Sequence, residues 1–257
     1  MSNMIYSISG DTEFFNGAKW KKLSECTETD NVLQYNEDGT AELVRPLAYG
    51  FERNDNEFYE FKHMGFPAKL TNYRSMVVRD SDSNRLVRCS CLAIKETMSV
   101  PVSCLYNGYL DLDRKSIARL IEGVESVEGA KYTFDLYTLS LDSKRVFIEY
   151  LMNSKFISEK NNFKFTYTSS RENMDLVGFL VSTSGGNFII DGDSMVVFTE
   201  NANCSRVGFS DDYVDYLKVS SEEEKYGLVV PSHMLVLRRK GLIFVAGDAY
   251  KNVQVLG

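Results

Sequence analysis

The sequence predicts a mainly β fold, in which both ends of the chain form one β-domain around an inserted α+β segment. Tyr and Phe are abundant, with 15 and 16 among 257 residues, and Pro is scarce at four, which favours strands over a helical bundle. Short alternating segments between turn residues fill 1–100 and return in 218–257, whereas apolar residues at helical spacing are found in 101–217. This order indicates an insertion within a β-domain whose two halves pair with each other.

Turn signals separate the strand candidates of residues 1–100. Asn16-Gly17 follows the segment GDTEFF and is typical of a hairpin turn. In VLQYNEDGTAELV, two alternating segments flank Asn36-Glu37-Asp38-Gly39, which predicts a second hairpin. The candidates EFYEFKHM, AKLTNYRSMVVRD and NRLVRCSCLAI follow, and Pro67 and Asp80-Ser81-Asp82 separate them.

Residues 101–217 predict a mixture of helices and strands. The segment DRKSIARLIEGVESV has apolar residues at helical spacing and Asp113 as its cap, and SLDSKRVFIEYLMNSKF repeats this pattern. NFKFTYTSS predicts a strand, and RENMDLVGFLVSTSGG predicts a third helix that ends at a glycine pair. NFIIDGDSMVVFTE predicts a hairpin with Asp191-Gly192-Asp193 as its turn.

The last segment, 218–257, returns to strands. MLVLRR and LIFVAG predict a hairpin around Lys240-Gly241, and the apolar run ends at Gly247-Asp248. We therefore predict three stretches, which are a first β part over 1–100, an insert over 101–217 and a closing β part over 218–257.

Charge and composition argue against several classes of function. A net charge of −7 disfavours DNA as a partner. Lys155, Lys160, Lys164 and Arg171 are interpreted as solvated charges rather than as a local basic patch. Five scattered cysteines suit a reducing compartment, and with only two histidines they disfavour a zinc site. The chain has no long apolar run and no signal peptide, which predicts a protein that neither enters a membrane nor is secreted by a standard route.

Two motifs stand at opposite ends of the predicted β-domain. Near the start are Ser7-Ile8-Ser9-Gly10-Asp11-Thr12, Asn16-Gly17 and DNVLQYNEDG, and near the end is VVPSHMLVLRRKGLIFVAGD. Together they resemble the opening and closing blocks of an intein, the Hint-fold self-splicing domain. The resemblance covers about 95 residues at the start and 40 at the end, and it implies a Hint-like β-domain.

The middle segment carries a second resemblance. RLIEGVESVEG, FIEYLMNSKF and YTSSRENMDLVGFLVSTSGGNF resemble the helix and strand–helix segments of a LAGLIDADG homing endonuclease, the insert that many inteins carry. Two ordinary amphipathic helices explain the first two segments equally well. The predicted fold is thus a Hint-like β-domain with a LAGLIDADG-like insert.

The intein resemblance implies where the splicing groups would be. Ser7 matches the first residue, whose hydroxyl attacks the preceding carbonyl and forms an ester. Thr71 opens the match to a Thr-x-x-His block, whose histidine acts as general acid, but Arg74 occupies the histidine position. Arginine stays protonated and cannot transfer a proton, although it can stabilise an oxyanion. A shift of one residue in this match would place Tyr73 in the slot.

The closing block lacks the groups for the last steps. Asp248 replaces the asparagine whose side chain cyclises, and Ala249 replaces the Cys, Ser or Thr that accepts the transferred chain. Ser7, Thr71, Arg74 and Asp248 are therefore predicted to be vestigial splice-site positions, and splicing is predicted to be lost.

The endonuclease resemblance implies an acid at the end of each of two helices, where a divalent metal activates water. Glu128 keeps a carboxylate at the first position, but the second falls near Asn153-Ser154. Glu128 is thus a vestigial acid and a weak metal ligand, and no cofactor is expected except Mg²⁺ if nuclease activity remains.

The sequence therefore predicts a free-standing, degenerate intein relative of phage type, retained for a binding or structural role rather than as an enzyme. The segments outside the motifs, 1–6 and 249–257, are too short for host-protein halves. A protein partner or assembly into a virion is expected, in the host cytoplasm or the virion. Two alternatives stay open, which are a residual site-specific DNA endonuclease and a Hint-type autoprotease that uses Ser7.

Overall fold

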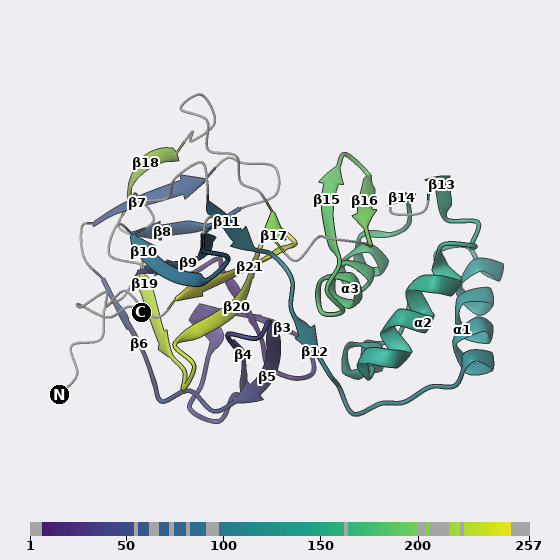
Figure 1. The fold of residues 1–257 in the computed structure, drawn as a ribbon, viewed down its shortest axis with the longest axis horizontal. Coiled ribbons are helices and arrows are strands. Elements are labelled where there is room, and N and C mark those ends of the chain that lie inside the picture. Colours follow the sequence, from purple (N-terminus) through teal and green to yellow (C-terminus); the bar gives the residue numbers. More distant parts are fainter. Residues whose placement is uncertain are drawn as a thin grey trace. The chain divides into compact units, whose positions relative to one another are not determined.

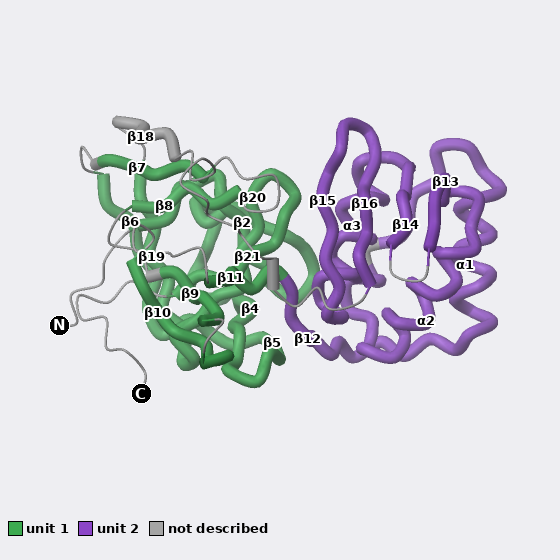
Figure 2. Tube along the Cα trace, turned by 45° about the horizontal axis from the view of Figure 1, so that its top comes forward, with its two compact units in different colours: residues 1–102, 204–257 green, residues 103–203 purple. Residues whose placement is uncertain are grey.

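The chain forms two compact units (Figure 2). The computed structural model describes residues 7–53, 56–61, 67–71, 75–80, 83–90, 98–161, 164–199, 204–205, 216–221 and 224–247. Unit 1 combines Met1–Val102 with Cys204–Gly257, and unit 2 is Ser103–Asn203. Unit 2 ends before the predicted boundary at 217, because strand β17 (Cys204–Ser205) already pairs with β11 (Met98–Pro101) of unit 1.

Unit 1 is built from two sets of strands (Figure 1). The first sheet has the order β18 (Tyr216–Ser221), β7 (Asn56–Phe61), β8 (Lys69–Thr71), β1 (Ile8–Ser9), β19 (Lys225–Val229) and β6 (Ala48–Glu52). The second runs β5 (Thr40–Val44), β4 (Val32–Tyr35), β20 (Met234–Arg239), β21 (Leu242–Gly247), β9 (Ser75–Asp80), β11 and β17. Three further strands join its side, β10 (Leu86–Ser90) on β9, β2 (Glu13–Phe15) on β20, and β3 (Trp20–Lys22) on β2.

The two ends of the chain pair with each other, as predicted. Ile8 of β1 lies opposite Tyr226 of β19, and Phe14 of β2 lies opposite Leu237 of β20. The side chains of Ile8, Phe14, Tyr226 and Leu237 all belong to one buried apolar cluster. The prediction of a mainly β fold whose β-domain uses both chain ends is therefore confirmed. The burial of apolar side chains from both the first and the last strands stabilises unit 1.

The closing hairpin also forms where the sequence predicts it. Strands β20 and β21 pair in register from Met234↔Gly247 to Arg239↔Leu242. Lys240 and Gly241 both have positive φ, 50° and 83°. Two consecutive residues with positive φ twist a two-residue turn in the sense that matches the strand twist.

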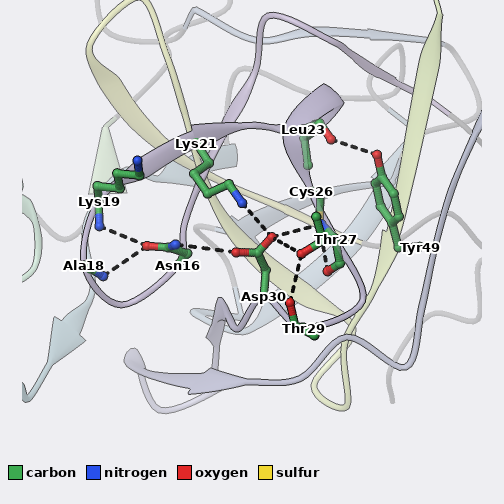
Figure 3. Close-up of polar contacts among 10 residues, drawn as sticks. All are labelled: Asn16, Ala18, Lys19, Lys21, Leu23, Cys26, Thr27, Thr29, Asp30 and Tyr49. Atoms are coloured by element: carbon green, nitrogen blue, oxygen red, sulfur yellow. Dashed lines mark hydrogen bonds and ion pairs between the residues drawn. The ribbon is translucent and has the colours of Figure 1, made fainter.

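The Asn16-Gly17 turn joins β2 to β3 (Figure 3). The Asn16 side-chain Oδ1 accepts hydrogen bonds from the backbone N–H groups of Ala18 and Lys19, at 3.1 and 3.0 Å. Gly17 has a φ of +100°, which a glycine adopts without strain. The dipeptide thus supplies both the side-chain acceptor and the backbone conformation of the turn.

Asp30 connects this turn to the loop around Thr27 (Figure 3). Its Oδ2 accepts hydrogen bonds from Lys21 Nζ at 2.7 Å and from Thr27 Oγ1 at 2.8 Å. Burial alone would raise the pKa of the Asp30 carboxyl, but the hydrogen bonds from Lys21 and Thr27 lower it to about 2. The carboxylate is therefore charged at neutral pH and anchors the start of unit 1.

Unit 2 is a mixed α/β body. Its elements in chain order are β12 (Leu105–Tyr106), α1 (Arg114–Ser126), the 3₁₀ helix η3 (Phe134–Thr138), α2 (Leu141–Leu151), β13 (Ile157–Lys160), β14 (Lys164–Tyr167), α3 (Arg171–Ser182), β15 (Asn187–Asp191) and β16 (Ser194–Phe198). The sheet has the order β13-β14-β16-β15. Side chains of Asp113, Ser140 and Ser170 cap the three α-helices.

Close packing joins α3 to the hairpin β15–β16. Gly178 of α3 lies against the ring of Phe188, and a Cβ at this position would come within 2.6 Å of that ring. A larger residue here would force the helix away from the strand. None of the helices in the described part of the chain has the length and apolar content that crossing a membrane requires.

Candidate functional site

The structure brings two of the predicted splice-site positions together. The register Ile8↔Leu70 between β1 and β8 places Ser7 opposite Thr71, and Thr71 N donates to Ser7 O at 2.9 Å. On the other side, Ser7 N donates to Tyr226 O at 3.0 Å. The backbone of Ser7 is therefore held between β8 and β19, in the middle of the sheet.

Side-chain alternation divides this part of the sheet into two faces. Ile8, Leu70 and Tyr226 pack into the apolar core. Successive side chains of a strand point to opposite faces, so their neighbours point away from that core. These neighbours form what we call the polar face, which consists of Ser7, Ser9, Lys69, Thr71 and Lys225. All five are buried, with exposures of 0%, 0%, 6%, 2% and 0%.

The hydroxyl of Ser7 stands out on the polar face. Ser7 Oγ is buried and has no hydrogen-bond partner among the residues that the structure describes. Its neighbour Ser9 differs, because Ser9 Oγ lies 3.0 Å from Thr12 Oγ1. A buried hydroxyl without a partner costs about 1–3 kcal/mol, so a stability argument does not explain Ser7.

Two ion pairs join the opening motif to the closing motif. Arg238 Nε donates to Glu13 Oε2 at 2.7 Å, and Arg239 Nε donates to Asp11 Oδ2 at 2.9 Å. Arg239 is 4% exposed and also donates to Glu60 Oε1 at 2.8 Å. The arginine pair of the closing motif therefore binds acids of the opening motif and of β7.

These contacts shift the titration of the acids. Burial would raise the pKa of Asp11, but its hydrogen bond from Arg239 holds it below the usual value. Hydrogen bonds from Lys240 and Arg239 lower the pKa of Glu60 as well. Both carboxylates are charged at neutral pH, so the arginine is compensated.

Two predicted positions lie outside the described residues. Arg74 follows Thr71, the last described residue of β8, and Asp248 follows Gly247, the last residue of β21. Ala249 and the alternative Tyr73 are outside them too. Their roles stay predictions from the sequence.

Glu128 lies beyond the end of α1 rather than on the helix, because α1 ends at Ser126. It lines a cavity of about 500 Å³ together with Lys155, Phe156 and Ser170. Within the ranges given above, no cluster of three or more His, Cys, Asp or Glu side chains could hold a metal ion. Glu125 is the other acid that lines this cavity.

The candidate basic patch of unit 2 is engaged in local contacts. Lys155 Nζ donates to the backbone carbonyl of Glu125, and Lys160 Nζ donates to Asn153 Oδ1 at 3.0 Å. Arg171 Nε lies 3.7 Å from Asp175 Oδ1. These contacts favour the interpretation that the charges stabilise their own surroundings.

The buried lysines of the polar face were not predicted. Lys69 Nζ lies 5.1 Å from the centre of the Phe58 ring, and Lys225 is fully buried on β19. A signal is present in the sequence, because AKLT and KYGLVV each carry a lysine at the start of an apolar strand. Lysine side chains are rarely fully buried. The burial of both lysines could therefore be predicted only from the pairing of the strands, which the sequence does not show.

No protein-family model and no curated protein matches the chain. Among solved structures, the fold is similar to a splice-inactive variant of the AceL NrdHF class 3 split intein, with a TM-score of 0.46 and 12% sequence identity. The match covers 95% of this chain and 99% of that chain. A similarity at this level of identity does not assign a role to any residue of this chain.

Proposed function

We propose that unit 1 is an intein-like Hint domain that no longer splices and that retains the first reaction step at Ser7. The observation that carries this proposal is the buried Ser7 Oγ, which lies opposite Thr71 and has no described hydrogen-bond partner. The pairing of both motifs in one sheet supports it, since β1 meets β19 of the closing segment.

The reactants are the hydroxyl of Ser7, the peptide bond that precedes Ser7, and water. Ser7 Oγ attacks the carbonyl carbon of the preceding residue, the new C–O bond forms, and the C–N bond to Ser7 breaks. The hydroxyl proton passes to the freed nitrogen, so the product is an ester with an amine at Ser7. Water then cleaves the ester and releases residues 1–6 as a carboxylic acid. Splicing would require an asparagine and an acceptor where Asp248 and Ala249 stand.

We expect the purified full chain to lose residues 1–6 slowly at neutral pH and faster with hydroxylamine, which at this pH attacks esters far more readily than amides. Intact-mass spectrometry follows the loss. Ser7→Ala should abolish cleavage, and Ser7→Cys should accelerate it because a thiolate is the stronger nucleophile. Ser9→Ala is the matched control, since Ser9 bonds Thr12, and it should cleave as the wild type does. If the wild-type chain keeps its intact mass after hydroxylamine treatment, the proposal is wrong.

A binding or structural role, including a place in a phage virion, is the second candidate. It is favoured by exposed apolar side chains at the β6 edge, where Leu47 is 65% and Phe51 is 58% exposed. The same mass measurement separates the two candidates, because a purely structural protein keeps residues 1–6. A protein partner is then the expected ligand.

A residual DNA endonuclease is the weaker alternative for unit 2. Glu128 lines a cavity, which is the one observation in its favour. We expect no cleavage of linear or supercoiled DNA when the full chain is incubated with Mg²⁺. A cut that Glu128→Gln abolishes and Glu122→Gln leaves intact would restore this alternative.

A further inference from the structure

A cavity of about 500 Å³ opens in unit 2 between the last turn of α1, the segment after α2 and the start of α3. Its lining includes Val124, Glu125, Glu128, Lys155, Phe156, Ser169 and Ser170. Val127 also lines it and is 59% exposed, so the cavity is open to solvent. Its volume and its mixture of apolar and polar walls are those of a small-molecule site.

The wall of this cavity is held in place by Asn173 of α3, which is 2% exposed. Asn173 Nδ2 donates to Ala130 O, and Asn173 Oδ1 accepts from Tyr132 N, each at 3.0 Å. One buried side chain thus binds the segment that leaves α1 to the first turn of α3. Buried polar groups with satisfied hydrogen bonds are rigid, so the cavity is preformed.

Two buried phenol hydroxyls border the cavity, those of Tyr132 and Tyr167, with side chains that are 8% and 0% exposed. Burial raises the pKa of Tyr167 to about 12, against the effect of the nearby Ser169 hydroxyl. Burial, followed by the neighbours Tyr167 and Glu125, raises the pKa of Tyr132. Because Ser169 and Glu125 line the cavity, the two phenol hydroxyls lie beside it.

Neither phenol oxygen has a partner in hydrogen-bond geometry within the described part of the chain. The neighbours that shift their titration are close, but they are not placed to bond. The Tyr167 ring is fixed against Phe156 of the cavity wall, edge to face, with ring centres 5.9 Å apart. Two unpaired buried hydroxyls at one open cavity indicate that a polar group entering it would complete them.

The charges of the wall favour a cation. Glu125 and Glu128 form no ion pair with the described residues, and Glu125 Oε1 accepts only a backbone N–H, that of Lys155, at 2.6 Å. The Lys155 ammonium donates to the backbone carbonyl of Glu125, at the end of α1, and leaves both carboxylates uncompensated. The positive end of α3 already has an acid, Glu172, in its first turn, so it does not require an anionic ligand.

We propose that this cavity binds a small organic ammonium ion with an apolar body. The ammonium donates to the Glu125 carboxylate and to the phenol oxygens beside it, since carboxylates accept and an ammonium offers three donors. The apolar body packs against Val124, Val127 and Phe156. This site is separate from Ser7 and does not depend on the acyl shift.

The test compares three probes of similar shape and different charge, which are 2-phenylethylammonium, 2-phenylethanol and phenylacetate. Each is titrated into the full chain at neutral pH, and the amide NMR shifts of residues 124–130, 155–156 and 169–170 are followed. The amine should saturate these shifts with an affinity at least about tenfold higher than that of the alcohol, because its hydrogen bonds are charge-assisted. Phenylacetate should not saturate them.

Three variants assign the effect to the wall. Glu125→Gln keeps an acceptor for Lys155 N and should weaken binding of the amine about tenfold. Tyr167→Phe should weaken it about threefold, while the unbound chain unfolds at the wild-type temperature because the hydroxyl bonds nothing there. Glu122→Gln is the matched control, an exposed acid of α1 outside the cavity, and should bind as the wild type does.

Equal affinity for the amine and the alcohol, tighter binding of phenylacetate, or no saturating shift with the amine up to about 10 mM would overturn the proposal. Wild-type affinity in Glu125→Gln would overturn it as well. The amide spectrum of each unbound variant shows whether it is folded. If Glu125→Gln unfolds, Glu128→Gln in the exposed turn takes its place, and its affinity decides the question.

Discussion

Replacing Arg239 by methionine is expected to lower the free energy of unfolding of unit 1 by about 3 kcal/mol. The Arg239 side chain is 5% exposed and forms ion pairs with Asp11 and Glu60, at 2.8 Å each. Its Nη1 also donates to the buried carbonyl of Pro67 at 2.9 Å. Removing one partner of a buried ion pair leaves the others uncompensated, which typically costs about 3–5 kcal/mol. The lower end applies because both acids keep some contact with water.

Lys240→Met is the matched control for this prediction. Lys240 Nζ binds the same Glu60 carboxylate at 2.7 Å, but its side chain is 61% exposed. An exposed pair contributes about 0–1 kcal/mol, so the control should change stability little. Urea unfolding followed by Trp20 fluorescence measures unit 1, because the chain has one tryptophan. Equal losses for Arg239→Met and Lys240→Met would show that burial of the arginine contributes nothing.

Local signals predicted the hairpin turns and the N-cap of the first helix well. Asn16-Gly17 and Lys240-Gly241 combine a turn former with a glycine, and both turns have the positive φ that such pairs favour. Asp113 accepts from Ser116 N at 2.7 Å, as the cap pattern indicates. Such features depend on residues a few positions apart, and the sequence shows them directly.

The polar face could not be predicted in this way. Ser7 and Thr71 were predicted as site residues from motif resemblance, whereas Lys225 was missed. Its burial depends on the pairing of β19 with β1, which joins residues more than two hundred positions apart. A one-residue change of register would turn Lys225 to the other face. The boundary at 203 was missed for the same reason, because it depends on the pairing of β17 with β11.

Lys144 of α2 is a fully buried basic residue of unit 2. Its Nζ donates to Tyr106 O at 2.6 Å. The same Nζ lies 4.5 Å from the centre of the Tyr106 ring and 5.3 Å from that of the Phe179 ring. Burial lowers the pKa of Lys144 to about 7, although the neighbouring Cys104 acts in the opposite direction. Burial therefore favours the neutral amine of Lys144 far more than water does.

We expect the stability of unit 2 to rise by about 1–2 kcal/mol between about pH 7 and pH 8.5. In the unfolded chain a lysine stays protonated to about pH 10, so in this window the unfolded state binds more protons than the folded state. Stability must then increase with pH. The gain ends at higher pH, because burial raises the pKa of Cys104 to about 12 and the unfolded thiol ionises from about pH 9.

Lys144→Met should remove this pH dependence, whatever its effect on absolute stability. Hydrogen exchange of the α2 and α3 amides, corrected for the intrinsic rate at each pH, reports unit 2 separately from Trp20. Lys131→Met is the control, because Lys131 forms an exposed pair with Glu172, with side-chain exposures of 56% and 59%. It should keep the wild-type slope. A wild-type slope of zero, or a slope that persists in Lys144→Met, would contradict this prediction. Lys144 would then stay charged in the core, and the Tyr106 carbonyl and the rings of Tyr106 and Phe179 would compensate the cost of burying the charge.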